Sequence, residues 1–465
     1  MSGRSLGALL DGDPDDVVVY AQGVATTRAE LRARADEIAQ QLRTAALERQ
    51  AIGVLAPNGS GAVASWFAVW SVGGAFVPLN PRVPDVERER AIAATGVAAV
   101  IEPPAVRARA GVPPRPVQAG EAIIQFTSGT TGRPKPVPLR HDTVLSLLDG
   151  VIGSLRAPRT TGSAERRAPM PNLVPVSLSL WAGIYQVLFA FRLGAPVVLM
   201  DRFEPVEFAH LVREFGIRSS VLPPAAMVML ADDAAVANLE PLRYVRSVSA
   251  PLSPVHARRF HDRFGVAILN GYGQTELGGE VVGWTAADWK QFGASKLGAA
   301  GRPHAGIDVR VVDGELQVRS RSTKPAGDLG DRLTGDGWLR TGDLARVDDD
   351  GFVWIDGRVS AMVNRGGLKV FPDEVEEHLR AFPGVADAAV AGVPDDRLGE
   401  VPWAFLVVSP GATVDAGALH AWCRERMAPY KVPAGVTIVD ELPRNEIGKL
   451  LRQELVPLVP VDRES

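Results

Sequence analysis

Residues 126–137, Phe-Thr-Ser-Gly-Thr-Thr-Gly-Arg-Pro-Lys-Pro-Val, form the stretch from which the rest of the chain can be interpreted. They follow an apolar, strand-like run at 122–126. Glycines let backbone N–H groups turn inward without a Cβ in the way, hydroxyls add donors, and a lysine supplies a positive charge. The pattern predicts a loop that wraps a polyphosphate, with the candidate residues Thr127, Ser128, Gly129, Thr130, Thr131, Gly132 and Lys135.

This loop differs from the Walker pattern G-x-x-x-x-G-K-[ST]. Arg133 and Pro134 separate the last glycine from Lys135, and Pro136 follows it, so a kinase or motor ATPase is disfavoured. The structural alternative is a flexible Ser/Gly/Thr linker, but such linkers seldom follow a buried strand or end in Pro-Lys. By itself the loop indicates an anion site, most simply for a nucleotide.

The composition of the chain excludes several classes of protein. Its 465 residues predict two or more domains, and a net charge of −4 gives no sign of a nucleic-acid or anionic-membrane partner. The single cysteine, Cys423, excludes a disulfide framework and favours a reducing, cytoplasmic setting. The apolar stretches 62–79 and 174–200 are broken by glycine, proline or arginine, which favours buried α/β core over membrane spans.

Short apolar strands alternate with helical patterns through the first part of the chain. This alternation predicts parallel sheets with helices on both faces. The Pro/Arg-rich stretch 103–117 is expected to be a surface loop. The expected elements are 28–47, 51–55, 60–72, 75–79, 86–94, 97–101, 142–155, 205–215, 219–222, 224–231, 244–249, 254–264 and 266–269.

Beyond about residue 300 the sequence pattern changes from alternating strands and helices to hairpins. Alternating patterns around Asp313-Gly314 and around 348–351 predict two hairpins. Residues 357–367 are interpreted as a junction. After them a small α/β unit is expected, with elements at 372–381, 385–391, 401–408, 415–427 and 436–439.

A second motif, Asn-Gly-Tyr-Gly-Gln-Thr-Glu at 270–276, stands at the carboxyl end of an expected parallel strand, where ligands bind in such sheets. Tyr272 offers an aromatic face for a base, Thr275 a hydroxyl for a phosphate, and Glu276 a carboxylate for Mg²⁺. The alternative is a glycine-rich strand exit with a packed tyrosine.

Three further motifs lie downstream. Asp343, in Leu-Arg-Thr-Gly-Asp at 339–343 between the hairpins, could accept both hydroxyls of a ribose, although an aspartate after glycine is often only part of a turn. The segment 357–369 runs from Gly-Arg to Gly-Gly-Leu-Lys. Residues 443–449, Pro-Arg-Asn-Glu-Ile-Gly-Lys, present Lys449, one of only seven lysines in the chain; alone, such a lysine is usually solvated.

Taken in this order, the motifs resemble those of the adenylate-forming superfamily of acyl-CoA synthetases, luciferases and peptide-synthetase adenylation domains. The stretches 73–81, 249–254 and 358–374 match as well, so the resemblance spans nearly the whole chain. It implies an α/β fold: a large N-terminal domain of stacked α/β sheets with a small β-barrel-like subdomain (1–357), and a small mobile C-terminal α+β domain (358–465) with a hinge near 358–361.

The resemblance also implies a two-step reaction. A carboxylic acid attacks the α-phosphate of ATP, with Mg²⁺ present, to give an acyl-adenylate; the thiol of coenzyme A then displaces AMP. Residues 127–135 would hold the β- and γ-phosphates, Asp343 would grip the ribose, and Arg358 would assist. The remaining implied nucleotide and catalytic residues are Ser249, Ala250, Pro251, Asn270, Gly271, Tyr272 and Gly273 around the adenosine, Thr275 at the α-phosphate, Glu276 on the metal, and Lys449 between carboxylate and α-phosphate.

In this superfamily the small domain then rotates. Gly366, Gly367 and Lys369 would line the pantetheine channel, where a larger side chain than glycine would obstruct a narrow tunnel. The hinge position is Ser360, followed by Ala361, where charged residues are usual, and Pro136 stands where glycine is usual. These departures leave open a variant that mainly forms the thioester from a supplied acyl-adenylate.

The acyl pocket implied by the resemblance includes Val176, Ser177, Leu178, Trp181 and Ile184. Ser177 stands where amino-acid-activating relatives place an aspartate, so an α-amino acid would bury its ammonium without a counter-charge and is disfavoured. We expect an apolar acid: aryl, alicyclic, polycyclic or medium-chain. The alternatives are a ligase whose acceptor is a carrier-protein phosphopantetheine and, from a different class, a silent relative that binds adenylate without turnover.

Overall fold

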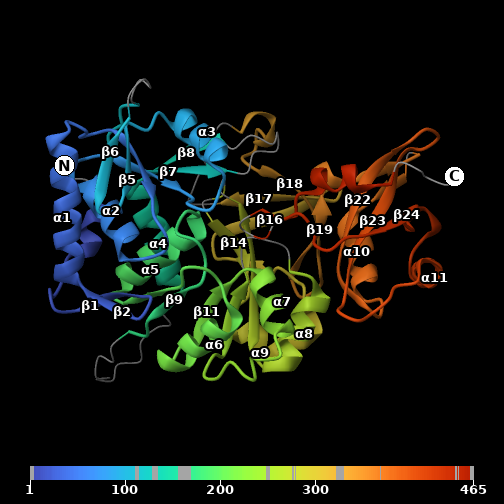
Figure 1. Ribbon diagram of the computed structural model, residues 1–465. Helices are drawn as coiled ribbons and strands as arrows, with labels where there is room; N and C mark the ends of the chain where they lie inside the picture. Colours follow the sequence, from blue (N-terminus) through green and yellow to red (C-terminus); the bar gives the residue numbers. More distant parts are fainter. Residues whose placement is uncertain are drawn as a thin grey trace. The chain divides into compact units, whose positions relative to one another are not determined.

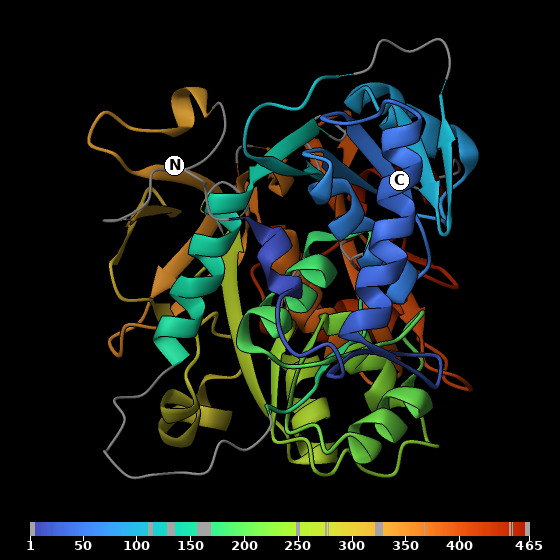
Figure 2. The same ribbon diagram turned by 90° about the vertical axis from the view of Figure 1, so that its left-hand side faces the viewer.

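A computed structural model describes residues 5–109, 115–127, 135–155, 169–247, 252–274, 277, 279–320, 329–366, 368–445, 448 and 450–460. Side chains are described for all of these except Glu87, Thr127, Lys135, Ser154, Leu155, Ala294 and Ser360. The chain divides into two compact units, Met1–Val221 with Ala235–Arg243, and Leu222–Ala234 with Tyr244–Ser465. Figures 1 and 2 show the elements of each unit from two directions.

The first unit contains a six-stranded sheet in the order β6-β5-β3-β4-β7-β8. Its four central strands are parallel, as the alternation predicted, and the strand at each edge is antiparallel to its neighbour. The strands are β3 (Ala51–Leu55), β4 (Ala75–Leu79), β5 (Ala99–Glu102), β6 (Ala105–Ala108), β7 (Glu121–Thr127) and β8 (Lys135–Arg140).

A second sheet of this unit has the order β2-β1-β10-β9. Its strands are β1 (Val17–Ala21), β2 (Val24–Thr27), β9 (Asn172–Val174) and β10 (Val197–Leu199). The helices of the unit are α1 (Arg28–Thr44), α2 (Ser60–Ser71), α3 (Asp85–Thr95), α4 (His141–Leu155), α5 (Trp181–Leu193) and α6 (Pro205–Glu214).

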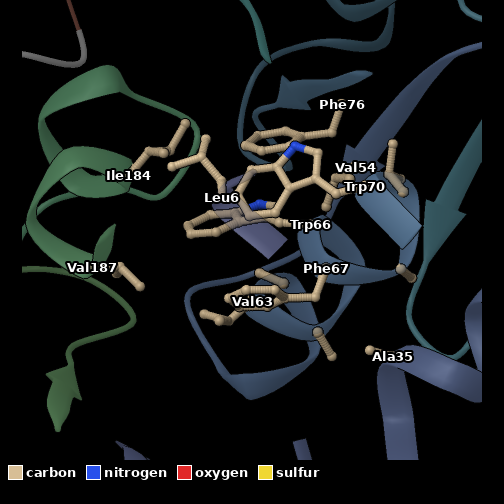
Figure 3. Close-up of a cluster of buried hydrophobic side chains, with 14 of the residues drawn as sticks. Leu6, Ala35, Val54, Val63, Trp66, Phe67, Trp70, Phe76, Ile184 and Val187 are labelled. Carbon is tan, nitrogen blue, oxygen red and sulfur yellow. The ribbon is translucent and has the colours of Figure 1, made fainter. Parts of the chain in front are cut away.

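The helix α1 shows how local sequence sets an element and directs its packing. Thr27 caps it in a capping box: its hydroxyl accepts from the Glu30 backbone N–H, and the Glu30 carboxylate accepts from the Thr27 backbone N–H at 2.8 Å. Leu31 and Ile38 are among the residues of its buried face, which packs against α2. Figure 3 shows the adjoining core, where Trp66 of α2 lies over Phe76 of β4 with ring centroids 5.2 Å apart.

Prolines mark the outer edge of the six-stranded sheet. Pro136 and Pro138 stand opposite Phe126 and Ile124 in the β7–β8 ladder. Two prolines at alternate positions lack their N–H groups on the same side of the strand, which an edge strand tolerates because that side has no partner strand. The glycine-rich stretch 128–134 thus joins two paired strands, although the second strand was not predicted from the sequence.

The second unit begins at Leu222, the last residue of β11 (Ser219–Leu222). Its strands β12 (Tyr244–Ser247), β13 (Ala267–Gln274), β14 (Gly279–Gly283) and β15 (Arg302–Pro303) lie side by side in that order. β13 is parallel to β12 up to Asn270 and antiparallel to β14 from Gly271 onward. The helices here are α7 (Pro224–Asp232), α8 (Pro254–Phe264) and α9 (Ala286–Phe292).

An antiparallel sheet in the order β16-β17-β18-β19 follows. It contains both predicted hairpins: β16 (Ile307–Val312) with β17 (Glu315–Ser320), and β18 (Leu339–Val347) with β19 (Val353–Arg358). At the second turn the Asp348 carboxylate accepts from Lys296 Nζ at 2.7 Å and from Trp354 Nε1 at 2.9 Å. Burial alone would raise the pKa of Asp348, but these hydrogen bonds outweigh it and lower the pKa to about 2.

The rest of the unit is a small α+β module. Its strands run in the order β21-β20-β23-β22, and β24 pairs with β23. The elements are β20 (Val363–Arg365), β21 (Leu368–Val370), α10 (Pro372–Arg380), β22 (Val385–Asp395), β23 (Gly399–Val408), α11 (Ala416–Arg426) and β24 (Gly435–Ile438). Two hydrophobic clusters within 363–459 draw all their described members from this module, so it has a core of its own.

The structure corrects three sequence-based expectations. The stretch 103–117 is not only loop, because Ala105–Ala108 form the edge strand β6. Residues 339–343 lie inside β18 rather than between hairpins, and residues 270–274 continue β13 rather than leaving it. Among the described residues, no helix is both long and apolar enough to cross a membrane.

Candidate active site

Three side chains converge on the carboxylate of Asp343, which is only 3% exposed. The Tyr272 hydroxyl donates to Oδ2 at 2.6 Å, and the Gln274 amide donates to the same oxygen at 2.7 Å. Arg358 forms an ion pair with Oδ1, with its Nε at 2.9 Å. Two motifs far apart in the sequence, 270–276 and 339–343, thus meet at one buried charge.

Strand register explains this convergence. Asp343 and Arg358 stand directly opposite each other in the β18–β19 ladder. Tyr272 and Gln274 are two residues apart on β13, and alternate residues of a strand project from the same face. The Asp343 backbone N–H donates to the Thr341 hydroxyl at 3.1 Å, which fixes the strand at this point.

The electrostatics of the site keep Tyr272 protonated. Burial and the nearby negative charge of Asp343 raise the pKa of the Tyr272 hydroxyl above its usual value. Tyr272 is therefore a neutral hydrogen-bond donor at physiological pH. Asp343 is left as the acceptor in this cluster, which suits it to hold hydroxyl donors of a ligand.

Gln274 and Thr341 are parts of this cluster that sequence reasoning missed. Besides its bond to Asp343, the Gln274 amide donates to the Thr341 carbonyl at 2.9 Å and so links β13 to β18. Its Oε1 accepts from Arg332 at 3.0 Å. Their positions could have indicated them: Gln274 stands two residues after Tyr272, and Thr341 stands two residues before Asp343. Residues two apart on a strand lie on the same face.

Glycine is required along β13 because β14 approaches it closely. A Cβ on Gly273 would overlap the backbone carbonyl of Gly279, and a Cβ on Gly271 would meet the Glu280 carboxylate. Asn270, just before, accepts from the Gly271 backbone N–H at 3.1 Å and donates to the Ala299 carbonyl at 3.2 Å. The glycines therefore let the hairpin close and hold Tyr272 in place.

We expect Gly273→Ala to weaken ATP binding, raising the KM for ATP by roughly tenfold or more, because the added methyl would push β14 away and displace Tyr272. Gly335→Ala is the matched control, since a Cβ there meets nothing within 4 Å. Steady-state kinetics at varied ATP would measure the change. An unchanged KM for ATP in Gly273→Ala would show that this close approach is unimportant for the nucleotide.

A charged trio that sequence reasoning did not single out is centred on Glu280 of β14, a residue of this hairpin. Glu280 pairs with Arg246 of β12 and lies 3.0 Å from His304 Nε2. Burial alone would raise the pKa of Glu280, but the His304 hydrogen bond and the Arg246 charge outweigh it, so the pKa is lowered. The available signal was a charged residue, Arg246, within the predicted strand at 244–249.

The expected acyl-pocket residues lie in the first unit. Asn58 organises their backbone: its amide donates to the Val176 carbonyl at 2.9 Å and its Oδ1 accepts from the Leu178 N–H at 2.7 Å. Ile184 is fully buried in the core drawn in Figure 3, and Leu178 belongs to the same hydrophobic cluster. Val176, Ser177 and Trp181 are only partly buried.

Two of the expected pantetheine residues, Gly366 and Lys369, are described, the first just after β20 and the second within β21. Gly366 has φ +59°, which favours glycine, and its N–H donates to the Leu398 carbonyl at 2.8 Å. Lys369 is exposed on β21. In the motif at 443–449, which contains the expected catalytic Lys449, Gly448 lies close to α7: a Cβ built on Gly448 would be 3.3 Å from the Cβ of Ala225, near the start of that helix.

Several predicted site residues fall outside the described residues, so their roles stay predictions. For Thr127 and Lys135 only the backbone pairing at the end of the β7–β8 ladder is described. The hinge residue Ser360 lies in a single 3-10 turn, Val359–Ala361, without a described side chain. The others are Ser128, Gly129, Thr130, Thr131, Gly132, Ser249, Ala250, Pro251, Thr275, Glu276, Gly367 and Lys449.

Comparison with known proteins places this chain in a family. The profile of the AMP-binding enzymes matches residues 9–329, and that of the AMP-binding enzyme C-terminal domain matches residues 374–449. A feruloyl-CoA synthase from an Amycolatopsis species is 32% identical over 95% of this chain and 96% of its own length. A fatty acid–[acyl-carrier-protein] ligase from Streptomyces coeruleorubidus is 31% identical over 71% of this chain and 66% of its own.

The fold has known counterparts as well. The structure of an o-succinylbenzoate CoA synthetase from Bacillus subtilis, in complex with an acyl-adenylate, superposes with a TM-score of 0.79 over 97% of each chain at 24% identity. The chain therefore belongs to the family of AMP-binding enzymes. It is an adenylate-forming acid–thiol ligase of the acyl-CoA synthetase type, as its motifs implied.

Proposed function

We propose that the enzyme activates an apolar carboxylic acid that is not an α-amino acid, such as an aryl, alicyclic, polycyclic or medium-chain acid, and transfers its acyl group to coenzyme A. The observation that carries the nucleotide half of this proposal is the meeting of Tyr272, Gln274 and Arg358 at Asp343. A buried carboxylate with fixed partners is preorganised to accept ribose hydroxyls. Packing of Ile184 and Leu178 into the core leaves Val176, Ser177 and Trp181 as the candidates to contact the acid.

The chemistry asks for charge stabilisation rather than a protein nucleophile, because the carboxylate of the acid is already ionised. In our proposal Thr127–Lys135 bind the β- and γ-phosphates, Thr275 the α-phosphate and Glu276 a Mg²⁺ ion. Lys449 neutralises the charge that develops as the carboxylate oxygen attacks the α-phosphorus and pyrophosphate leaves. We also propose that residues 358–465 form the mobile domain, which the separate hydrophobic clusters of that segment support.

The acceptor has two candidates. Similarity to a feruloyl-CoA synthase favours free CoA, and similarity to a fatty acid–[acyl-carrier-protein] ligase supports the alternative of protein-bound phosphopantetheine. Both acceptors present the same pantetheine arm, so Gly366, Gly367 and Lys369 would serve either one.

ATP–pyrophosphate exchange driven by a panel of acids would test the proposal. We expect exchange with apolar acids, little with α-amino acids, and thioester formation when CoA is added. Exchange without a thioester on CoA, but with one on a carrier protein, would move the enzyme to the alternative acceptor. If no acid drove exchange and a synthetic acyl-adenylate still gave a thioester, the first half-reaction would be lost. If neither occurred, the proposal would be wrong.

A further inference from the structure

Backbone contacts join the described residues that flank Lys449 in the sequence. Arg444 and Leu450 form a bridge, and the Leu451 N–H donates to the Pro443 carbonyl at 2.9 Å. The Gly448 N–H donates to the Asn445 carbonyl at 2.8 Å, and Gly448 has φ +76°. The described residues before and after Lys449 are therefore held in a tight turn.

The Arg444 guanidinium ties this turn to the body of the module. One nitrogen donates to the Gly448 carbonyl at 2.8 Å, and another donates to Asp387 Oδ2 on β22 at 2.7 Å. The Gly448 carbonyl belongs to the peptide group that joins Gly448 to Lys449. The side chain of Arg444 thus fixes the backbone immediately before the lysine.

Asp387 is itself firmly held. Its Oδ1 accepts from Arg380 Nε at 3.0 Å and from the Ala388 N–H at 2.8 Å. Burial alone would raise the pKa of Asp387, but the charges of Arg380 and Arg444 outweigh it, so the pKa is lowered and the carboxylate stays ionised. Arg380 continues the network to the buried carboxylate of Glu376 at 3.0 Å.

The turn at Gly448 lies against the helix α7, which belongs to the same unit. A Cβ on Gly448 would come within 3.3 Å of the Ala225 Cβ, so the turn lies against the beginning of α7 with room for glycine and little more. A small displacement of the turn would therefore change its contact with α7. A charge-assisted hydrogen bond to the turn resists such a displacement more strongly than a neutral one would.

We propose that Arg444 and Asp387 are positioning residues for Lys449, which fix the turn so that the lysine acts in adenylation. This inference rests on the proposed role of Lys449 in that step. Because misplacing a reacting group by about 1 Å can cost roughly 10²-fold in rate, loss of the Arg444 bridge should lower the adenylation kcat by about tenfold. The KM for ATP should change little, because the ribose cluster at Asp343 is not altered.

The test compares Arg444→Ala, alone and in a Lys449→Ala background, by ATP–pyrophosphate exchange and by thioester formation from a preformed acyl-adenylate. Arg444→Ala alone should lose about tenfold in exchange kcat and keep its thioester rate. In the Lys449→Ala background it should add less than about twofold, because residues that act through one another are not additive. Arg424→Ala, on the exposed face of α11, is the matched control.

Equal losses in both half-reactions, or a full tenfold loss in the Lys449→Ala background, would overturn the positioning role. If Lys449→Ala itself left exchange unchanged, the proposed function of the lysine would fail instead, so the two failures are distinguishable. Asp387→Asn guards against misfolding, since it keeps an acceptor oxygen and loses only the charge. We expect it to show the same pattern as Arg444→Ala, with a smaller loss; a normal exchange rate in a folded Asp387→Asn enzyme would contradict the proposal.

Discussion

Lys449→Ala should lower acyl-adenylate formation by about 10²-fold or more, while thioester formation from a preformed acyl-adenylate remains largely intact. Removing one preorganised charge from a transition state in which negative charge develops typically costs this much. In our proposal the second step does not use this lysine, because the mobile domain turns before that step and brings Gly366 and Gly367, instead of Lys449, to the acyl-adenylate. Exchange assays and single-turnover thioester assays on the same preparation would measure the two effects separately.

Lys290→Ala is the matched control for this variant, because Lys290 is an exposed lysine on α9. It should leave both half-reactions at the normal rate. Parallel losses in the two steps for Lys449→Ala would contradict the assigned role and would point to a general effect on the C-terminal module. An unaltered adenylation rate would remove the lysine from the mechanism altogether.

Asp343→Asn should raise the KM for ATP by roughly 10- to 100-fold, with little change in the KM for the acid. The substitution removes the charge from an acceptor that the Tyr272 hydroxyl and Arg358 both approach. A charge-assisted hydrogen bond contributes about 1.5–3 kcal/mol, so the loss of one such contribution to a ribose gives a change of this size. Steady-state kinetics and calorimetric titration with AMP would both report it.

Asp336→Asn provides the matched control, because Asp336 is an exposed carboxylate in the turn before β18, paired with Arg310 at 3.2 Å. It should leave the KM for ATP unchanged. Asp343 is buried, so thermal melting must accompany the kinetics. A lower melting temperature with a normal KM for ATP would assign Asp343 to the fold and not to the nucleotide.

The order of helices and strands was largely predictable because the central strands are buried on both faces. β3 and β4 appear at the predicted bounds, since continuous apolar runs between helical patterns leave few alternatives. The edge strand β6 was not predictable in this way. It is short, follows two prolines and is mostly exposed, so its sequence carries no apolar alternation.

Site residues that belong to a motif with recognisable chemistry could be predicted from the sequence. A residue that joins the site only through its position on a strand could not. Tyr272, Asp343 and Arg358 were chosen from motifs, and the structure brings them together. Gln274 was missed because glutamine carries no distinctive chemical signal; only its position two residues after Tyr272 reveals it. The strand β13 continues past Asn270 because it pairs with β14 there. No local sequence pattern predicted β14.

The two prolines of β8 have a consequence for how molecules of this enzyme meet one another. An exposed strand normally offers a row of amide donors that a strand of another chain can join, which is a route to aggregation. With Pro136 and Pro138 at alternate positions, this margin lacks two of those donors. The two prolines therefore leave this edge of the sheet with fewer backbone donors for a strand of another molecule to join.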